Sequence, residues 1–336
     1  MKACIVGAGA IGGFIGTKLA ASGKAEVSAV ARGAALLALQ EHGWRMKQGD
    51  TLLRGRVTAA SADAGDLGMQ DLVILAVKGP ALASVAPYIA PLLGPQTVVL
   101  PAMNGVPWWF SHSTGMLADR PLHSVDPGGR IARAIPLPHV VGCVVHASAA
   151  LAEPGFVQHK LGQSLIIGEP QGGVLSRTRD LATLLTEAGF DVTLSENVRD
   201  DVWYKLWGNL TMNPVSAITG ATTDRLLDDP LVREFCSAAM REAAAIGERI
   251  GCSLPQTPEL RHAVTRKLGA FKTSMLQDVE ASRELELDSI VSAVQEIGVR
   301  VCVPTPNINA ILGMARLFGR VRGLYPETGP KSASAV

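Results

Sequence analysis

Short apolar runs alternate with amphipathic stretches through the first part of the chain. The apolar runs have the length of strands, and the stretches between them repeat apolar residues with helical spacing. Strands that alternate with helices predict a parallel, doubly wound sheet with right-handed crossovers, a Rossmann-type α/β fold. The predicted strands are residues 2–6, 25–30, 71–77 and 96–105, and the predicted helices between them include residues 14–21 and 81–93.

The pattern changes at about residue 197, where strand-like runs give way to long helical ones. Helices are predicted at residues 231–250, 258–268 and 275–297, and Ser274 with Gln277 matches a capping box before the last of these. We therefore expect an all-helical C-terminal domain. The predicted division is residues 1–196, residues 197–325 and a frayed tail at 326–336.

Residues 106–140 fit neither pattern. They are rich in Pro and Gly but also contain Trp108, Trp109 and Phe110. Adjacent tryptophans are rare in a disordered linker, so we expect an ordered excursion that packs on the sheet or over the cleft.

Composition narrows the class of protein. The chain has 336 residues, 47% hydrophobic residues and a formal net charge of +1. It has no basic surplus for binding nucleic acid, and its apolar runs are far shorter than the ~20 residues that span a bilayer. Five scattered cysteines without a CxxC pair are typical of thiols in a reducing compartment, so we expect a cytoplasmic protein without a metal site. The sequence does not fix the oligomeric state, and a homodimer is possible.

The most informative polar residues lie at four-residue spacing. Lys205, Asn209 and Asn213 form one stripe if their segment is helical, with Trp203 and Trp207 roughly 200° away on the opposite side. Interior asparagines lower helix stability, which suggests that another role retains them. The alternative is a short exposed face that ends where Pro214 bends or interrupts the helix.

A glycine motif follows the first predicted strand. Gly7, Gly9 and Gly12 form GxGxxG immediately before a helix, the context in which backbone amides and a helix N-terminus bind a pyrophosphate. A purely structural tight turn is the alternative. With the residues between them, the predicted cofactor-binding turn comprises Gly7, Ala8, Gly9, Ala10, Ile11 and Gly12.

The residue types beyond the other strands favour NADPH. Arg32 stands near the position where an NAD site would have an acidic residue, and its guanidinium can bind a 2′-phosphate. Lys78 and Asn104 follow later strands, where ligands of parallel sheets bind; we assign Lys78 to cofactor phosphates or ribose and Asn104 to the nicotinamide and substrate. An ordinary surface arginine, a solvated lysine and a turn-forming asparagine remain alternatives.

A nicotinamide site combined with the Lys205 stripe suggests hydride transfer to a carbonyl. A cationic donor would stabilise the developing alkoxide and deliver a proton to it, and Lys205 fits that role. Burial in a cleft would lower the pKa of this lysine, and a nearby carboxylate such as Glu286 would oppose that change. Glu286 could also accept a hydrogen bond from a substrate hydroxyl; a solvated helix glutamate is the alternative.

Together these motifs resemble ketopantoate reductase (2-dehydropantoate 2-reductase). The resemblance rests on GAGAIG, Arg32, AVK with Lys78, MNG with Asn104, the K-x-x-x-N-x-x-x-N-P run and SMLQD followed by Glu286, in order from residue 1 to about 320. The K-x-x-x-N pattern is shared with related hydroxyacid dehydrogenases, whereas the N-P that follows it together with SMLQD is not.

The resemblance implies NADPH-dependent reduction of a branched 2-oxo acid to its 2-hydroxy acid, the step of pantothenate biosynthesis. It implies that Lys205 is the general acid. It also implies that the substrate is bound by Asn104, Lys205, Asn209, Asn213 and Ser274. It also implies that Glu286 faces substrate and cofactor, and that the backbone of Ala149 contacts the cofactor.

Two features depart from the family pattern and leave the substrate open. Thr223 stands where the family often has a further substrate-binding asparagine, and the 106–140 excursion is longer than the compact pattern. One alternative is a related dehydrogenase for a different 2-oxo or 3-hydroxy acid. The other is a binding module that senses NADPH without turnover.

Overall fold

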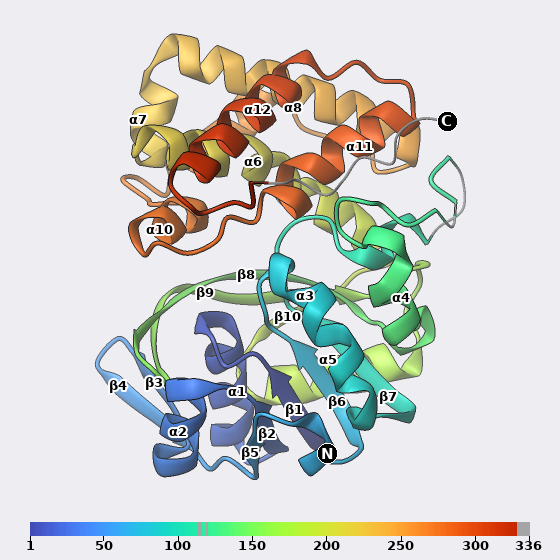
Figure 1. Ribbon diagram of the computed structural model, residues 1–336, viewed down its shortest axis with the longest axis vertical. Coiled ribbons are helices and arrows are strands. Elements are labelled where there is room, and N and C mark those ends of the chain that lie inside the picture. Colours follow the sequence, from blue (N-terminus) through green and yellow to red (C-terminus); the bar gives the residue numbers. More distant parts are fainter. Residues whose placement is uncertain (113–115, 119, 328–336) are drawn as a thin grey trace. The chain divides into compact units, whose positions relative to one another are not determined.

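The computed structural model describes residues 1–112, 116–118 and 120–327, and its internal contacts divide the chain into two compact units (Figure 1). Unit 1 consists of Met1–Asn104 and Arg130–Asp201. Unit 2 consists of Gly105–Gly129 and the described part of Val202–Val336. Across the described ranges, none of the helices is long and apolar enough to cross a membrane.

The centre of unit 1 is the predicted parallel sheet. Its strand order is β5-β2-β1-β6-β7, and every pairing within it is parallel. The chain order of these strands across the sheet is 3-2-1-4-5, the arrangement of a Rossmann-type fold, so the predicted fold class is confirmed. The strands are β1 (Lys2–Val6), β2 (Glu26–Val30), β5 (Ala60–Ser61), β6 (Gln70–Leu75) and β7 (Leu93–Pro101).

The main helical segments of unit 1 around this sheet lie in the connections after β1, β2 and β6. The predicted helix at residues 81–93 is an α-helix only at its start and continues as a 3₁₀ segment, which contains Pro87 and Pro91. The segments are α1 (Ala10–Ser22) after β1, α2 (Gly33–His42) after β2, and α3 (Gly79–Val85) with η2 (Ala86–Leu92) after β6.

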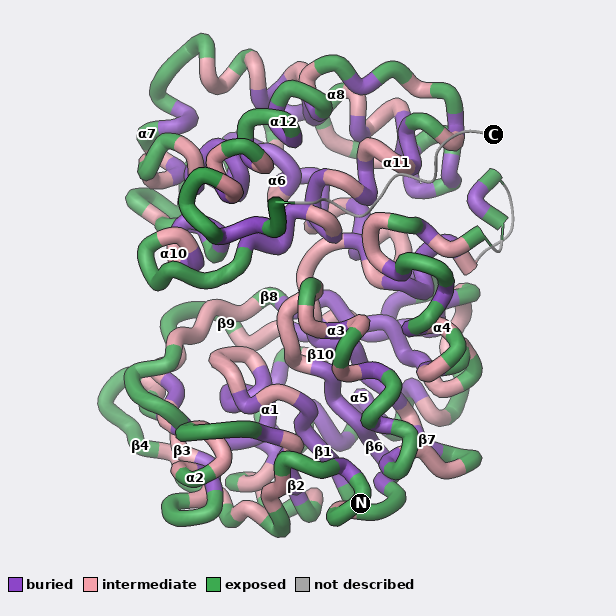
Figure 2. The backbone as a smooth tube through the Cα atoms, in the orientation of Figure 1, coloured by how far each residue is buried: buried purple, intermediate pink, exposed green. Residues whose placement is uncertain are grey.

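A second sheet, which the apolar pattern did not reveal, covers the other side of α1. Its strand order is β10-β9-β3-β4, and β8 pairs antiparallel with β9. Helix α1 contacts strands of both sheets, and Figure 2 shows the buried residues concentrated along the central strands of unit 1. The strands are β3 (Trp44–Gln48), β4 (Thr51–Gly55), β8 (Gly142–Glu153), β9 (Phe156–Gly168) and β10 (Asp191–Leu194).

The core of unit 1 forms where these two sheets meet α1. Phe14, Ile15 and Leu19 of α1 are fully buried in one apolar cluster with Val157 of β9 and Trp44 of β3. Each large apolar side chain that is fully buried stabilises the fold by about 1.5–3 kcal/mol. This packing holds the N-terminus of α1 at the end of β1, where the glycine motif lies.

Residues 106–140 divide between the two units, so the predicted packing on the sheet is found only for their last part, which lies beside β7. Residues 105–129 belong to unit 2, where Phe110 of η3 (Trp108–Ser111) stacks on Trp203 with 5.9 Å between ring centroids. Residues 130–140 belong to unit 1 and include α4 (Arg130–Ala134) and η5 (Leu137–His139). The physical reason is the burial of Trp108, Trp109 and Phe110. Large aromatic side chains need apolar partners, and Phe110 finds one in Trp203 of the helical unit 2.

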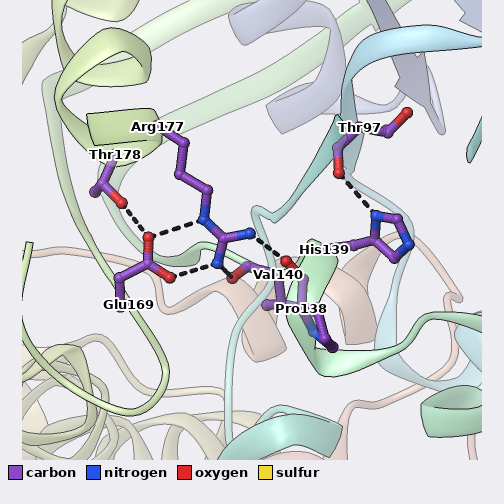
Figure 3. A network of polar contacts seen from close by, with 7 residues as sticks. All are labelled: Thr97, Pro138, His139, Val140, Glu169, Arg177 and Thr178. Carbon is purple, nitrogen blue, oxygen red and sulfur yellow. Dashed lines mark hydrogen bonds and ion pairs between the residues drawn. The ribbon is translucent and has the colours of Figure 1, made fainter. Parts of the chain in front are cut away.

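Figure 3 shows the polar contacts that hold Pro138, His139 and Val140 to the rest of unit 1. Arg177 of α5 (Ser176–Glu187) pairs with the buried carboxylate of Glu169 and donates to the carbonyls of Pro138 and Val140. His139 Nδ1 donates to the carbonyl of Thr97 in β7 at 2.9 Å. The charge-assisted bonds of Arg177 and the bond of His139 together anchor the start of β8 beside β7.

Unit 2 is helical, as predicted. The predicted helices at 231–250 and 258–268 correspond to α8 and α9. The helices are α6 (Val198–Thr219), which begins in unit 1, α7 (Thr223–Asp228), α8 (Pro230–Ile250), α9 (Pro258–Arg266), α10 (Ser274–Glu280), η6 (Asp288–Ser292), α11 (Ala293–Arg300) and α12 (Pro306–Val321).

Three local predictions about these helices need correction. Pro214 does not interrupt α6, which continues to Thr219. The N-cap of α10 is Thr273, whose hydroxyl accepts from Leu276 N at 3.2 Å, and not Ser274. The predicted helix 275–297 is two helices: α10 ends at Glu280, Ser282 has a positive φ of 51°, and the chain becomes helical again as the π-helical turn η6. Of the predicted frayed tail, residues 328–336 lie outside the described residues.

The buried His262 of α9 makes unit 2 sensitive to acid. Its side chain is 4% exposed, and Nε2 donates to Ser237 Oγ at 3.0 Å because that hydroxyl itself donates to the carbonyl of Arg233. Burial lowers the pKa of His262 below its ordinary value, with Glu259 opposing the shift. The unfolded chain therefore binds a proton more readily, and stability falls as the pH drops below about 6.5 towards the lower folded pKa.

We expect His262→Gln to flatten this dependence, since its amide can still donate to Ser237 but cannot be protonated. Thermal unfolding between pH 7.5 and pH 5 measures it: the wild type should lose Tm more steeply than the variant. Replacement of the exposed His42 is the control. Parallel curves for the wild type and His262→Gln would contradict the prediction.

Candidate functional site

Unit 1 contains an open cavity of about 710 Å³ at the carboxyl ends of β1 and β2. In parallel α/β sheets, this edge is where ligands bind. Its lining comes from the end of β1 with the glycine turn, from the end of β2 with the start of α2, from the segment after β5, from the segment after β6 with α3 and η2, and from one residue of β8. The lining residues are Val6, Gly7, Ala8, Gly9, Val30, Ala31, Arg32, Ala35, Ala62, Asp63, Ala64, Val77, Val85, Tyr88, Ile89 and Leu151.

The glycine turn has the geometry that a dinucleotide site needs. Gly7 has φ +96°, a conformation that other residues rarely adopt, and its amide donates to Val30 O at 3.1 Å. A Cβ at Gly12 would lie 2.0 Å from the carbonyl oxygen of Gly7, so only glycine allows α1 to approach the turn. Gly9 is the N-cap of α1, with open space where its Cβ would stand. The first turn of α1 has no acidic residue, so no carboxylate of the helix itself repels a phosphate at its N-terminus.

The predicted turn residues occupy distinct places. Gly7, Ala8 and Gly9 line the cavity, whereas Ala10 and Ile11 begin α1 and Gly12 packs behind the turn. This arrangement presents backbone amides of the turn rather than side chains to a ligand.

Arg32 lies at the cavity and is exposed, directly after β2. The cavity lining contains one acidic residue, Asp63, and its carboxylate already accepts the amide of Gly65 at 2.8 Å as the N-cap of η1 (Ala64–Asp66). Because Arg32 is the positive side chain of this cavity, it can bind a phosphate on the ribose.

The remaining predicted cofactor residues lie at the ends of neighbouring strands. Lys78 is the half-buried N-cap of α3, three residues beyond β6, and the half-buried Asn104 lies three residues beyond β7. Ala149 of β8 pairs with His159 of β9, and the next residue but one, Leu151, lines the cavity. Alternate residues of a strand share a face, so Ala149 lies on the face of β8 that reaches the cavity.

The sequence reasoning named only Gly7, Ala8, Gly9 and Arg32 among the lining residues, and three of those it missed have side chains that a ligand can contact. Asp63 follows the two-residue strand β5, which is too short to give a pattern, although its place after a strand is a usable signal. Tyr88 of η2 and Leu151 of β8 are exposed apolar side chains at the cavity, and nothing in the local sequence marks them. Tyr88 offers a ring on which a flat base can stack.

These observations fit a dinucleotide that carries a ribose phosphate. The cavity has a volume typical of a ligand site. The glycine turn at a helix N-terminus suits the pyrophosphate, and the exposed guanidinium of Arg32 suits the phosphate on the ribose.

In unit 2, the polar stripe forms as predicted on α6. Lys205 and Asn209 are half-buried and Asn213 is only 4% exposed, so the alternative of a short exposed face does not hold. The opposite side is anchored by two fully buried indoles: Trp203 Nε1 donates to Ala243 O at 3.3 Å and Trp207 Nε1 to Met240 O at 2.7 Å, both in α8. These bonds fix the rotation of α6 about its axis and hence the direction of the stripe.

The stripe meets the start of α10. Asn213 Nδ2 donates to Ser274 Oγ at 3.5 Å, which brings together two of the predicted substrate-binding residues. Thr223, the departure from the family pattern, is buried and binds the loop before α10: its amide donates to Phe271 O at 3.0 Å and its hydroxyl to Gly269 O at 3.1 Å. Its side chain thus supports the loop that leads to Ser274.

Glu286 is not the solvated helix residue that its spacing allowed. It is 9% exposed and lies in the non-helical segment between α10 and η6, directly before the helical residue Leu287. A carboxylate at the beginning of a helix is stabilised by the partial positive charge there. Buried carboxylates are uncommon without a role, which makes Glu286 a candidate for chemistry.

Comparisons with known proteins agree with this geometry. Residues 3–172 match the family model "Ketopantoate reductase PanE/ApbA", and residues 197–318 match "Ketopantoate reductase PanE/ApbA C terminal". The 2-dehydropantoate 2-reductase of Mesorhizobium japonicum is 42% identical over 97% of this chain and 100% of its own length. The chain belongs to the ketopantoate reductase family.

Solved structures place the ketopantoate reductase family fold over nearly the whole chain. A candidate ketopantoate reductase from Ralstonia solanacearum MolK2 has a TM-score of 0.93 and 54% identity, and the match covers 96% of this chain and 99% of that one. A D-mandelate dehydrogenase solved with NADH and anilino(oxo)acetate is 22% identical, with a TM-score of 0.82 over 96% of this chain and 100% of its own. That second likeness shows that a protein named as a D-mandelate dehydrogenase has the same fold.

Proposed function

We propose that this protein is an NADPH-dependent 2-dehydropantoate 2-reductase, which reduces 2-dehydropantoate to (R)-pantoate in pantothenate biosynthesis. Membership of the ketopantoate reductase family over nearly the full chain carries the proposal. The cavity in unit 1 has the backbone amides and the arginine that cofactor phosphates need. The stripe of Lys205, Asn209 and Asn213 on α6 of unit 2 offers a proton donor and side-chain amides for a substrate.

The proposed cofactor contacts follow from the cavity. The backbone of Gly7–Gly12 and the N-terminus of α1 hold the pyrophosphate, and Arg32 binds the 2′-phosphate. Lys78, Asn104 and the backbone of Ala149 complete the set. When bound, NADPH supplies the hydride that a carbonyl carbon accepts.

Lys205 is the proposed general acid. Its ammonium stabilises the negative charge that develops on the carbonyl oxygen and transfers a proton from Nζ to that oxygen. Its half-buried position on an apolar helix strengthens this electrostatic effect relative to bulk water.

Asn209, Asn213 and Ser274 are the proposed substrate-binding groups. The amides and the hydroxyl can donate to a carboxylate and bond a hydroxyl, and the 3.5 Å contact between Asn213 and Ser274 supports a shared role. Glu286 is proposed to accept a hydrogen bond from the substrate hydroxyl, because an ionised carboxylate is an acceptor only.

A panel of 2-oxo acids tests the substrate. Steady-state rates with NADPH and NADH should give the highest kcat/KM for 2-dehydropantoate with NADPH. A clear preference for another 2-oxo or 3-hydroxy acid would favour the related-dehydrogenase alternative, which the shared fold of D-mandelate dehydrogenase keeps open. Tight NADPH binding with no turnover of any member would favour the sensing module.

The proposal extends to location and assembly. All five cysteines are free thiols, four of them buried, which supports work in the reducing cytoplasm. Met314, Leu317 and Val321 form an exposed apolar stripe on α12, which supports a homodimer.

A further inference from the structure

The described part of Gly105–Gly129, here called the excursion, contacts two helical segments of unit 2: α6, which carries Lys205, and the segment that begins directly after Glu286. Its first contact is at η6. Val106 N donates to Ser289 O at 2.8 Å, and a Cβ at Gly105 would lie 2.5 Å from Ser289 Oγ. Ser289 is three residues beyond Glu286, in a π-helical turn, a feature often found at functional sites.

The second contact is at α6, two residues before Lys205. The ring of Phe110 is fully buried and stacks on Trp203 with centroids 5.9 Å apart and an interplanar angle of 21°. Trp203 is held from another direction by its bond to Ala243 O. Phe110 therefore closes the packing around the indole that fixes this turn of α6.

The third contact is at α11, which continues η6. The Glu296 carboxylate accepts the amides of His123 and Ser124 at 2.8 and 2.9 Å, and the Ser124 hydroxyl at 2.7 Å. Arg300, paired with Glu296 at 2.5 Å, donates to the carbonyls of Arg120 and Pro121. Charge-assisted bonds of this kind are about twice as strong as neutral ones, and here they bind loop backbone to one helix.

We propose that the excursion positions Lys205 relative to Glu286, with Phe110 and Glu296 as positioning residues. This inference rests on the proposed function. Excursion contacts reach both the turn before Lys205 and the helix that begins after Glu286, so the excursion links two segments about 80 residues apart in the sequence. Catalysis by a general acid is sensitive to such positions, because a displacement of about 1 Å can lower the rate roughly 10²-fold.

Packing that served stability alone would give a different pattern of effects. Removing it would lower Tm, and turnover well below Tm would not change. A positioning role predicts loss of kcat in a folded enzyme, with cofactor affinity retained because the cofactor cavity lies in unit 1.

The experiment compares Phe110→Leu and Glu296→Ala with the control Leu227→Ala in the full-length protein. Leu227 is a fully buried residue of unit 2 in a separate apolar cluster with Met212 and Cys236, and its truncation lowers stability without touching the excursion. Measurements are Tm, the Kd for NADPH by fluorescence, kcat and KM for the 2-oxo acid, and hydrogen exchange of peptides covering residues 202–206 and 285–292.

We expect both excursion variants to lose kcat about tenfold or more, with the Kd for NADPH unchanged and faster exchange in those two peptides. The conservative Glu296→Gln, which keeps an acceptor oxygen, should recover part of the lost kcat, and Leu227→Ala should keep wild-type kcat despite its lower Tm. The inference is overturned if the excursion variants lose no more kcat than Leu227→Ala, or if exchange in the two peptides is unchanged. Wild-type turnover reports separately on the proposed function, since its absence contradicts that function whatever the variants do.

Discussion

Replacing Lys205 by alanine is expected to lower turnover of the 2-oxo acid by about 10²–10⁴-fold, the contribution typical of a general acid. The Kd for NADPH should not change, because the cofactor cavity is lined by residues of unit 1. The decrease in absorbance of the reduced nicotinamide after rapid mixing gives the rate of turnover, and a fluorescence titration with NADPH gives the Kd.

Two further variants separate loss of the ammonium from loss of packing. Lys205→Met keeps an unbranched apolar stem on α6 without the charge and should be as inactive as the alanine variant. Lys267→Ala removes an exposed lysine from the C-terminal end of α9 and should retain wild-type rates. Substantial turnover by Lys205→Met would show that the proton comes from another group.

Removing the charge of Arg32 is the second change with a large expected effect. Hydrogen bonds to charged groups contribute about 1.5–3 kcal/mol, so Arg32→Ala should weaken NADPH binding roughly 10–100-fold. NADH has no 2′-phosphate and should bind almost as before. Arg32→Asp should go further and shift preference towards NADH, because a carboxylate repels the phosphate and can accept ribose hydroxyls.

Titrations with NADPH and NADH at two salt concentrations measure this selectivity. Arg56→Ala is the matched control, since Arg56 is an exposed arginine of unit 1 that does not line the cavity. Unchanged discrimination between the two cofactors in Arg32→Ala would show that the guanidinium does not contact the phosphate. A loss of selectivity that is largest at low salt is the expected signature of a charge interaction.

The strand and helix pattern predicted the parallel sheet of unit 1 because buried parallel strands are continuous apolar runs. The second sheet was missed because its strands are not continuous apolar runs. Strand β9 mixes exposed and buried positions without a regular alternation, β4 has no buried position at all, and the long β8–β9 pair contains register shifts that break the period of two.

Helix interiors were predicted better than helix junctions. The π-helical turn η6 and the positive φ of Ser282 arise where α10 ends and the chain turns to pack its next helix. Apolar residues at helical spacing lie on both sides of the polar residues 282–284, so the sequence predicted a single helix. The cap of α10 illustrates the same limit, because Thr273 and Ser274 are equally suitable caps and only the local backbone selects Thr273.

The sequence by itself determined the features that depend on neighbouring residues. GxGxxG after a strand specifies a tight turn into a helix, and four-residue spacing places Lys205, Asn209 and Asn213 on one helix face through backbone geometry alone. Tertiary structure decided the rest: the burial of Glu286, the cavity residues Asp63, Tyr88 and Leu151, and the division of residues 106–140 between the units. Each of these depends on packing between segments far apart in the chain, and a local pattern carries no information about which distant surface will cover it.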